Sequence, residues 1–233
     1  MTMYFSLIRL QRGLSPRNVA VLGLCDGYQM HKLIWDLFSD APDRRRDFLY
    51  RFEKTQGLPT FYAISKREPV DTLALWDIQT KPFAPRLKDG DRLSFSVRIN
   101  PIRSKRDENG RQHRHDVVME AKIKIGFKNL AGDQRPLIAN LVQQAGVDWL
   151  KSRENEYGFT VDGVEDRPQV RADGYSQHRF FKGKGKPPIT FSTLEFNGVL
   201  TVNDQEKFVN KCLYEGLGPA KGFGCGLMLV KRL

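Results

Sequence analysis

A glycine-rich stretch near the end of the chain reads Glu215-Gly216-Leu217-Gly218-Pro219-Ala220-Lys221-Gly222-Phe223-Gly224-Cys225-Gly226. Glycine adopts positive φ angles without strain and lets the backbone approach a ligand closely. The stretch is not a P-loop, because no Lys-Ser or Lys-Thr follows it, and the segment beyond it is too short for the βαβ unit of a dinucleotide fingerprint. Two interpretations remain. One is a turn that leads into a last strand, and the other is an anion cradle made by Lys221 and the backbone around Gly218, Gly222 and Gly224.

The charge of the whole chain favours a polyanionic partner. Its 233 residues include 38 Lys and Arg against 27 Asp and Glu, a formal net charge of +11 at pH 7. Such a protein is a natural candidate for binding nucleic acid, although excess charge also serves solubility alone. No apolar run reaches the roughly 18 residues of a membrane helix, and no basic amphipathic helix stands out, so we expect no membrane association. The cysteines Cys25, Cys212 and Cys225 lack paired spacing, which fits reduced thiols in the cytoplasm and gives no zinc pattern.

The first hundred residues show the element order of a ferredoxin-like domain. Alternating apolar and polar residues predict strands at residues 4–10, 47–54, 60–66 and 92–99. Helical periodicity covers residues 26–38, and a short second helix is expected at residues 69–75 or just beyond. The resulting order is β-α-β-β-α-β.

The second half repeats this order loosely, without a sequence repeat. A basic loop is expected at residues 103–116, with a turn at Asn109-Gly110, and it marks the predicted domain boundary near Lys105. The elements expected beyond it are an extended segment at 117–127, a long helix at 136–153, strands at 169–181 and 189–202, a helix at 203–214 and a closing strand at 223–231.

The predicted helix at residues 26–38 carries a candidate catalytic pair. At about 100° per residue, Tyr28 and His31 lie together on a flank of the helix, away from the centre of its apolar face near Leu37. RNA contains its own nucleophile, the 2′-OH beside each phosphate, and a histidine with a pKa near 6.5 can act as base or acid at neutral pH. Tyr28 is a candidate for orienting the 2′-OH or donating to the phosphate. On the residues alone, a structural role at the domain boundary is the more common alternative.

Two further basic segments are candidates for RNA contact. The first holds four basic residues around a Gly- and Pro-rich turn, with no acidic residue between them: Arg179, Lys182, Lys184 and Lys186. A hairpin with such charge can contact RNA phosphates, and the alternative is a flexible, solvated turn. Arg103 and Lys105 belong to a second, weaker patch. No metal site is expected, because the carboxylates are scattered and His113-x-His115 lacks further ligands at suitable spacing.

Five segments, in this order along the chain, resemble the CasE family within the RAMP superfamily of CRISPR RNA-binding proteins. They are Tyr28–Phe38, Pro42–Leu49, Asn100–Arg103, Phe196–Asp204 and Gly216–Leu227. The glycine-rich segment carries the most specific similarity. The Tyr28–Phe38 segment is the one most relevant to activity, because it is similar to the family segment that contains the active-site tyrosine and histidine.

The resemblance implies an α+β fold of two tandem ferredoxin-like (RRM-like, βαββαβ) domains, which we place at residues 1–104 and 105–233. It also implies a metal-independent endoribonuclease without a cofactor, which cleaves CRISPR repeat stem-loop RNA (pre-crRNA) by 2′-OH attack. The products would carry 5′-OH and 2′,3′-cyclic phosphate ends, and the enzyme would stay bound to the guide RNA beside the other Cascade subunits. The competing hypotheses are a non-catalytic RAMP-type RNA-binding scaffold and a basic RNA-binding protein unconnected with CRISPR.

Overall fold

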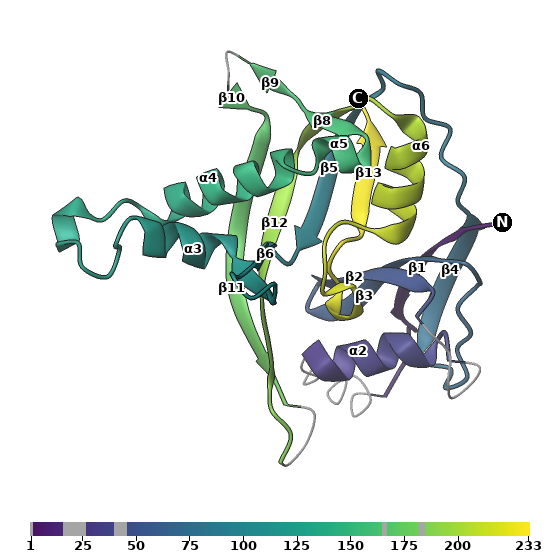
Figure 1. Ribbon diagram of the computed structural model, residues 1–233. Coiled ribbons are helices and arrows are strands. Elements are labelled where there is room, and N and C mark those ends of the chain that lie inside the picture. Colours follow the sequence, from purple (N-terminus) through teal and green to yellow (C-terminus); the bar gives the residue numbers. More distant parts are fainter. Residues whose placement is uncertain (1, 16–26, 40–45, 165–166, 182–184) are drawn as a thin grey trace.

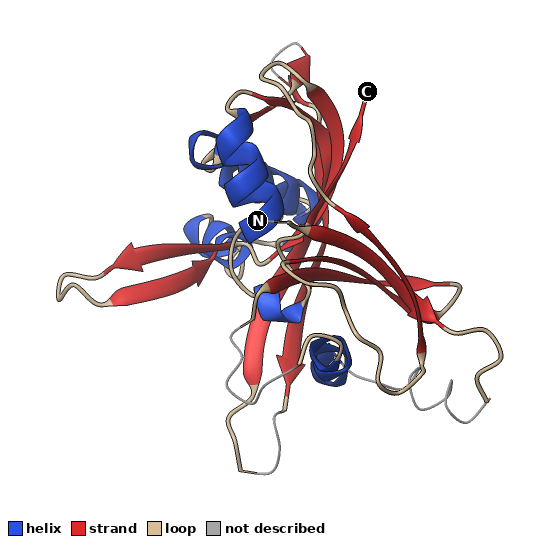
Figure 2. Cartoon of the chain, turned by 90° about the vertical axis from the view of Figure 1, so that its right-hand side faces the viewer, coloured by secondary structure: helices blue, strands red, loops and turns tan. Residues whose placement is uncertain are grey.

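The computed structural model describes residues 2–15, 27–39, 46–164, 167–181 and 185–233. The two largest sheets of the described residues are antiparallel, one of four strands and one of five, and helices pack against both (Figure 1). Figure 2 shows the strands of the two sheets as curved layers that meet near the middle of the molecule. No helix within the described residues combines the length and the apolar character that crossing a bilayer requires.

The first sheet contains β1 (Tyr4–Leu10), β2 (Phe48–Thr55), β3 (Leu58–Ser65) and β4 (Trp76–Pro82) in the spatial order β2-β3-β1-β4. All three pairings are antiparallel. Gln56 and Gly57 join β2 to β3 as a two-residue turn, with φ angles of 53° and 80°. Positive φ at both positions is what a type I′ hairpin turn requires. With α2 (Gly27–Asp36) as the first crossover, this is the strand order of a ferredoxin-like unit.

Helix α2 covers one face of the first sheet and confirms the helix predicted at residues 26–38. Its side chains at helical spacing, Met30 and Ile34, are buried together with Leu37 just beyond its end. They pack against inward-facing strand residues that include Ile8 and Phe61. Burying this apolar stripe fixes the helix on the sheet and determines which way its flank faces.

The second sheet repeats the same strand order. Its main strands are β5 (Arg92–Ile99), β11 (Val170–Phe180), β12 (Ile189–Val202) and β13 (Met228–Arg232), in the order β11-β12-β5-β13, and β8 (Phe159–Val161) also pairs with β12. Numbered from β5, this order is 2-3-1-4, as in the first sheet. The helices of this half are α3 (Val117–Lys124), α4 (Ile138–Lys151), α5 (Glu154–Tyr157) and α6 (Gln205–Lys207), which continues into η2 (Phe208–Glu215). The predicted α+β fold of two tandem ferredoxin-like domains is confirmed.

The prediction that residues 92–99 complete the first domain is wrong. Strand β5 pairs with β12 and β13, and its alternate residues, Leu93 to Ile99, are buried in the core of the second sheet. A short helix was expected at residues 69–75 or just beyond, but the second crossover of the first sheet, residues 66–75 between β3 and β4, contains no helix. The chain therefore passes from one sheet to the other between Pro82 and Arg92, ahead of the boundary expected at residues 104 and 105.

Two expectations for residues 103–127 also differ from the structure. The expected loop is a hairpin of β6 (Ile102–Arg106) and β7 (Gln112–Asp116), with Asn109-Gly110 in its turn. The segment expected to be extended is the helix α3. Asp116 caps this helix, because its Oδ1 accepts hydrogen bonds of 2.9 Å from the backbone N–H groups of Val118 and Met119.

The remaining elements are short: η1 (Gly132–Gln134), β9 (Gly163–Val164), β10 (Arg167–Pro168) and η3 (Lys221–Phe223). The two sheets are joined by an apolar cluster that contains Met3, Leu49 and Ile64 from the first half and Leu227 from the glycine-rich stretch. This contact brings the stretch between the two domains. It thereby places the C-terminal glycines beside α2, about 190 residues earlier in the chain.

Candidate active site between the two domains

His31 and the glycine-rich loop lie against each other. The rings of His31 and Phe223 have centroids 5.4 Å apart, and His31 also contacts Trp35 on its own helix at 5.9 Å. A Cβ atom added to Gly222 would lie 3.8 Å from His31 Cε1. The structure therefore brings together the two segments that the sequence selected independently.

The loop is held in place by backbone hydrogen bonds and by one side chain. The Leu217 N–H donates to the Gly226 carbonyl at 2.9 Å, and the Gly226 N–H donates to the Arg98 carbonyl at 2.7 Å. The Tyr50 hydroxyl donates to the Gly222 carbonyl at 2.9 Å. Burial raises the pKa of Tyr50 well above its usual value, so the hydroxyl keeps its proton and continues to donate.

Two cations lie beside the tip of this loop. A Cβ added to Gly222 would lie 3.1 Å from Arg46 Nη1, and Arg46 and Lys221 line the same cleft, which has a volume of about 830 Å³. Burial lowers the pKa of Lys221, and the neighbouring Arg46 charge lowers it further. Burial also lowers the pKa of Arg46. Asp47 and Glu215 line this cleft as well, but within the described part of the chain neither cation forms an ion pair with a carboxylate.

Two partly desolvated cations without ion-pair partners among the described residues make a suitable environment for an anion. Burial disfavours both positive charges, and the Arg46 charge additionally disfavours that of Lys221. A phosphate bound beside them would relieve these effects. Sequence reasoning missed Arg46 as a site residue. The available signal was the basic run Arg44-Arg45-Arg46 immediately before β2, but only the folding of the two domains brings its last member to the glycine loop.

The glycines of the loop differ in what they do. Gly222 allows the close approach of Arg46 and His31, whereas an added Cβ on Gly218 would lie 3.3 Å from the Trp149 ring. Gly224 has a φ angle of 80° and lies against Tyr50. A phosphate-binding role of Gly218 and Gly224 stays a prediction, since their contacts in this structure are with the protein itself.

The strands β11 and β12, which flank the basic segment predicted at residues 179–186, extend from the second sheet past α2 (Figure 1). Arg179 on β11 is exposed and lies over the Phe181 ring at 5.4 Å, and Lys186 is exposed beyond the turn. Lys182 and Lys184 lie outside the described residues. The same holds for the side chain of Tyr28, whose backbone belongs to α2.

Arg103 and Lys105 lie on a different face from the glycine loop. Arg103 and Lys105 both line a cleft beside α3 and α4. Lys105 also forms an ion pair with Glu120 of α3. Arg114 on the partner strand of the hairpin instead lines a cleft with Ala220 and Phe223. Neighbouring residues of a strand point to opposite faces of the hairpin. The register of the hairpin therefore decides which of its cations lie on the side of the glycine loop.

Together these features define a protein class. Two ferredoxin-like domains hold a histidine, two cations and a glycine-rich loop between them, and the chain carries a net charge of +11, an arrangement suited to a protein that binds and cleaves RNA. The chain belongs to the CRISPR associated protein family, whose model matches residues 3–232.

Two curated relatives are similar over most of the chain. The chain is 31% identical over 212 residues to the CRISPR system Cascade subunit CasE of Escherichia coli strain K12, a match that covers 89% of this chain and 93% of that protein. It is 28% identical over 218 residues to the CRISPR-associated endoribonuclease Cse3 of Thermus thermophilus, with 89% of this chain and 90% of that protein covered.

Solved structures of CRISPR proteins have the same fold. A structure of the CRISPR endoribonuclease Cse3 bound to a 19-nucleotide RNA matches with a TM-score of 0.70 and 25% identity, covering 99% of both chains. The crystal structure of Cas6e from Escherichia coli K-12 matches with a TM-score of 0.59 and 26% identity, covering 99% of this chain and all of the other.

Proposed function

We propose that this chain is a CRISPR repeat endoribonuclease that cleaves pre-crRNA at its stem-loop and stays bound to the guide RNA as a subunit of Cascade. One observation carries the proposal: His31 lies against the glycine-rich loop, and Arg46 and Lys221 lie at the tip of the same loop. The family membership and the relatives described as CasE and as an endoribonuclease support it. The absence of paired cysteine spacing fits action in the cytoplasm.

The reaction is a transesterification within the RNA. A base removes the proton of the 2′-OH, the 2′-oxygen forms a bond to phosphorus, and the bond from phosphorus to the 5′-oxygen breaks. An acid gives its proton to the departing 5′-oxygen, so the products carry a 2′,3′-cyclic phosphate and a 5′-OH. His31 performs one of these two proton transfers, and Tyr28 on the same helix orients the 2′-OH or donates to the phosphate.

Charge at the scissile phosphate is stabilised by the two cations. Arg46 and Lys221 offset the negative charge that develops on the phosphoryl oxygens, since preorganised positive groups act most strongly in a partly desolvated site. The side chains named here perform the chemistry without a metal ion. The basic hairpin with Arg179 and Lys186 contacts the RNA stem beside the site.

The experiment that tests this function uses the stem-loop repeat RNA of the same genome, labelled at one end and incubated with the protein in EDTA. We expect one cut with wild type, and loss of that cut in His31→Ala with hairpin binding retained. The matched control is His113→Ala, because His113 lies on the exposed β6–β7 hairpin and bonds only Asp107 among the described residues. RNA binding by wild type without a cut would assign the protein to the non-catalytic scaffold class.

A further inference from the structure

A cleft of about 590 Å³ opens between β2 of the first domain and the β11–β12 hairpin of the second. The residues that carry the proposed chemistry lie outside it, although Phe223 of the glycine loop forms part of its wall. The volume falls within the roughly 300–1,000 Å³ range of small-ligand sites. Its position, between the basic hairpin and His31, suggests a role in holding RNA beside the cut.

One wall of the cleft is aromatic. The rings of Phe180, Phe191 and Phe223 contact one another, with centroid distances of 5.1 Å between Phe191 and Phe223, 5.7 Å between Phe180 and Phe191, and 5.9 Å between Phe180 and Phe223. His178 stacks on Phe191 at 5.1 Å with an interplanar angle of 29°. All four rings are partly exposed, so each has a surface available to a ligand. Flat aromatic surfaces of this kind stack with nucleobases.

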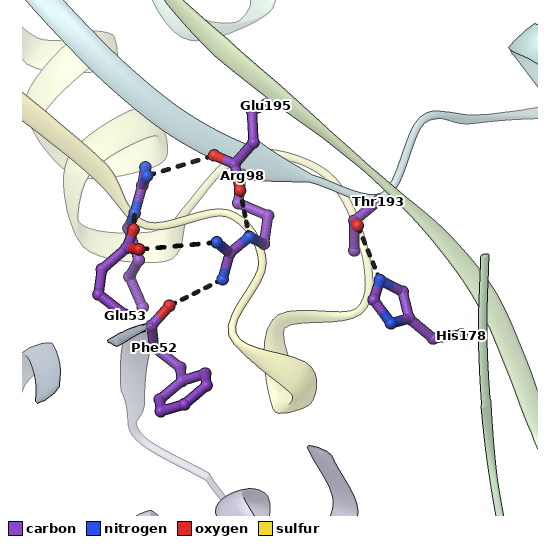
Figure 3. A network of polar contacts seen from close by, with 7 residues as sticks. Phe52, Glu53, Arg98, His178, Thr193 and Glu195 are labelled. Carbon is purple, nitrogen blue, oxygen red and sulfur yellow. Dashed lines mark hydrogen bonds and ion pairs between the residues drawn. The ribbon is translucent and has the colours of Figure 1, made fainter. Parts of the chain in front are cut away.

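The floor of the cleft is polar and its charges are compensated. Arg98 bonds Glu195 and donates from Nη1 to the Phe52 carbonyl at 2.8 Å, and Glu53 lies 3.8 Å from Arg98 Nη2 (Figure 3). Arg51 behind this group pairs with Glu195 at 3.2 Å and with Glu53 at 2.5 Å. Two guanidinium groups therefore face two carboxylates at the meeting of the two domains.

The remaining polar groups of the cleft are neutral at physiological pH, apart from Lys54 near its edge. His178 accepts from or donates to the Thr193 hydroxyl at 2.8 Å, and burial together with Arg98 lowers the pKa of this histidine. The cleft thus differs from the strongly basic surface of the chain. A phosphate gains little from a floor whose charges are already paired, whereas a neutral, flat group with a hydrogen-bonding edge matches both the wall and the floor.

We propose that this cleft binds one unpaired nucleobase of the RNA strand beside the scissile phosphate. The base stacks on the Phe180 and Phe191 wall, and its polar edge faces the Thr193 hydroxyl and the Glu195 carboxylate. The contact between Phe223 and His31 links the bound base to the reacting phosphate. This inference rests on the proposed function, because it assumes that the stem-loop RNA is bound with its cut at His31.

The test measures the affinity of stem-loop repeat RNA whose 2′-OH at the cut is replaced by hydrogen, so that binding is measured without cleavage. Each nucleotide flanking the cut is replaced in turn by an abasic one. With wild-type protein, we expect one position where loss of the base weakens binding by roughly 5- to 150-fold, the range that base stacking on an aromatic side chain provides.

Phe180→Leu and Phe191→Leu should then shrink this abasic penalty at the same nucleotide to less than about half its wild-type size. The matched control is Phe181→Leu, because Phe181 is 60% exposed, adjoins Phe180 and is absent from the cleft. In this control the penalty should be unchanged. Tight binding of the intact RNA with no sensitive position in wild type, or an equal penalty in all variants, would overturn the inference while leaving the proposed function in place. Failure of wild type to bind the intact RNA would instead remove the proposed function.

Discussion

The hydroxyl of Tyr50 and the carbonyl of Gly222 are joined by a hydrogen bond of 2.9 Å that spans 172 residues of sequence. Tyr50 belongs to β2 of the first domain, and Gly222 lies at the tip of the glycine-rich loop of the second. The hydrogen bond holds the tip of the loop next to His31. The proposed active site is therefore assembled by the docking of the two domains and does not exist within either of them.

Tyr50→Phe removes this bond and leaves the ring in place. We expect the free energy of unfolding to fall by about 0.5–1.5 kcal/mol, the usual net value of one hydrogen bond, and the rate of RNA cleavage to fall with it because the loop tip is released. Urea denaturation and single-turnover cleavage measure the two effects. Tyr62→Phe on the neighbouring strand is the control, since the Tyr62 hydroxyl makes no hydrogen bond within the described residues. Equal effects in both variants would contradict the role assigned to Tyr50.

Arg46→Ala removes one of the two cations at the loop tip. We expect kcat to fall on the order of 100-fold, because a positive group that stabilises charge in the transition state is lost, while the affinity for the stem-loop changes far less. Arg171→Ala serves as the control, because this exposed arginine of β11 pairs only with Asp173 in the part of the chain that the structure describes. A fall in affinity without a fall in kcat would show that Arg46 binds the RNA elsewhere.

Gly222→Ala tests the close approach at the loop tip. The new Cβ would lie 3.1 Å from Arg46 Nη1 and 3.8 Å from His31 Cε1, and the backbone at Gly222 needs no positive φ angle. We therefore expect a small change in stability and a roughly 10- to 100-fold lower rate of cleavage, because small displacements of catalytic groups slow the reaction strongly. Gly132→Ala is the control, since an added Cβ there meets open space. Unchanged cleavage in Gly222→Ala would show that this contact is not part of the site.

We expect the charged Lys221 to lower the stability of the folded protein and to raise the rate of RNA cleavage. Its pKa is lowered by burial and by Arg46, so the unfolded chain binds more protons than the folded chain between the lowered pKa and the usual value of 10.5, and this group's contribution to stability rises with pH in that window. At pH 7 the charged Lys221 is a destabilising group. Lys221→Met should therefore raise the free energy of unfolding at pH 7 and lower the cleavage rate about 100-fold. The exposed Lys211→Met is the control, and a less stable Lys221→Met protein would contradict this account.

Periodicity was sufficient to predict most elements of the fold but not their assignment to sheets. The alternation of Leu93, Phe95 and Val97 predicts a strand, and the same alternation would suit either sheet, because it records only that one face is buried. The partners of β5 follow from the packing of the whole chain. Likewise Val117 and Val118 favour an extended segment by their β-branched side chains, and the cap from Asp116 overrides that preference.

The candidate site was partly visible in the sequence. His31 and the glycine loop could be predicted from residue chemistry and resemblance. Arg46 and Tyr50 could not be assigned, because their roles depend on distances between segments that are far apart in the sequence. The choice between Lys105 and Arg114 needed the hairpin register, in which Ser104 pairs with Arg114.

The most direct test of the central claim is the chemistry of the ends that the enzyme leaves. Wild-type protein is incubated in EDTA with the stem-loop repeat RNA, and both fragments are weighed by mass spectrometry. A second RNA carries a single 2′-deoxy nucleotide on the 5′ side of the cut. The account predicts a 2′,3′-cyclic phosphate on one fragment, a 5′-OH on the other and no cleavage of the 2′-deoxy RNA. Fragments with 3′-OH and 5′-phosphate ends, or cleavage of the 2′-deoxy RNA at the same bond, would contradict it.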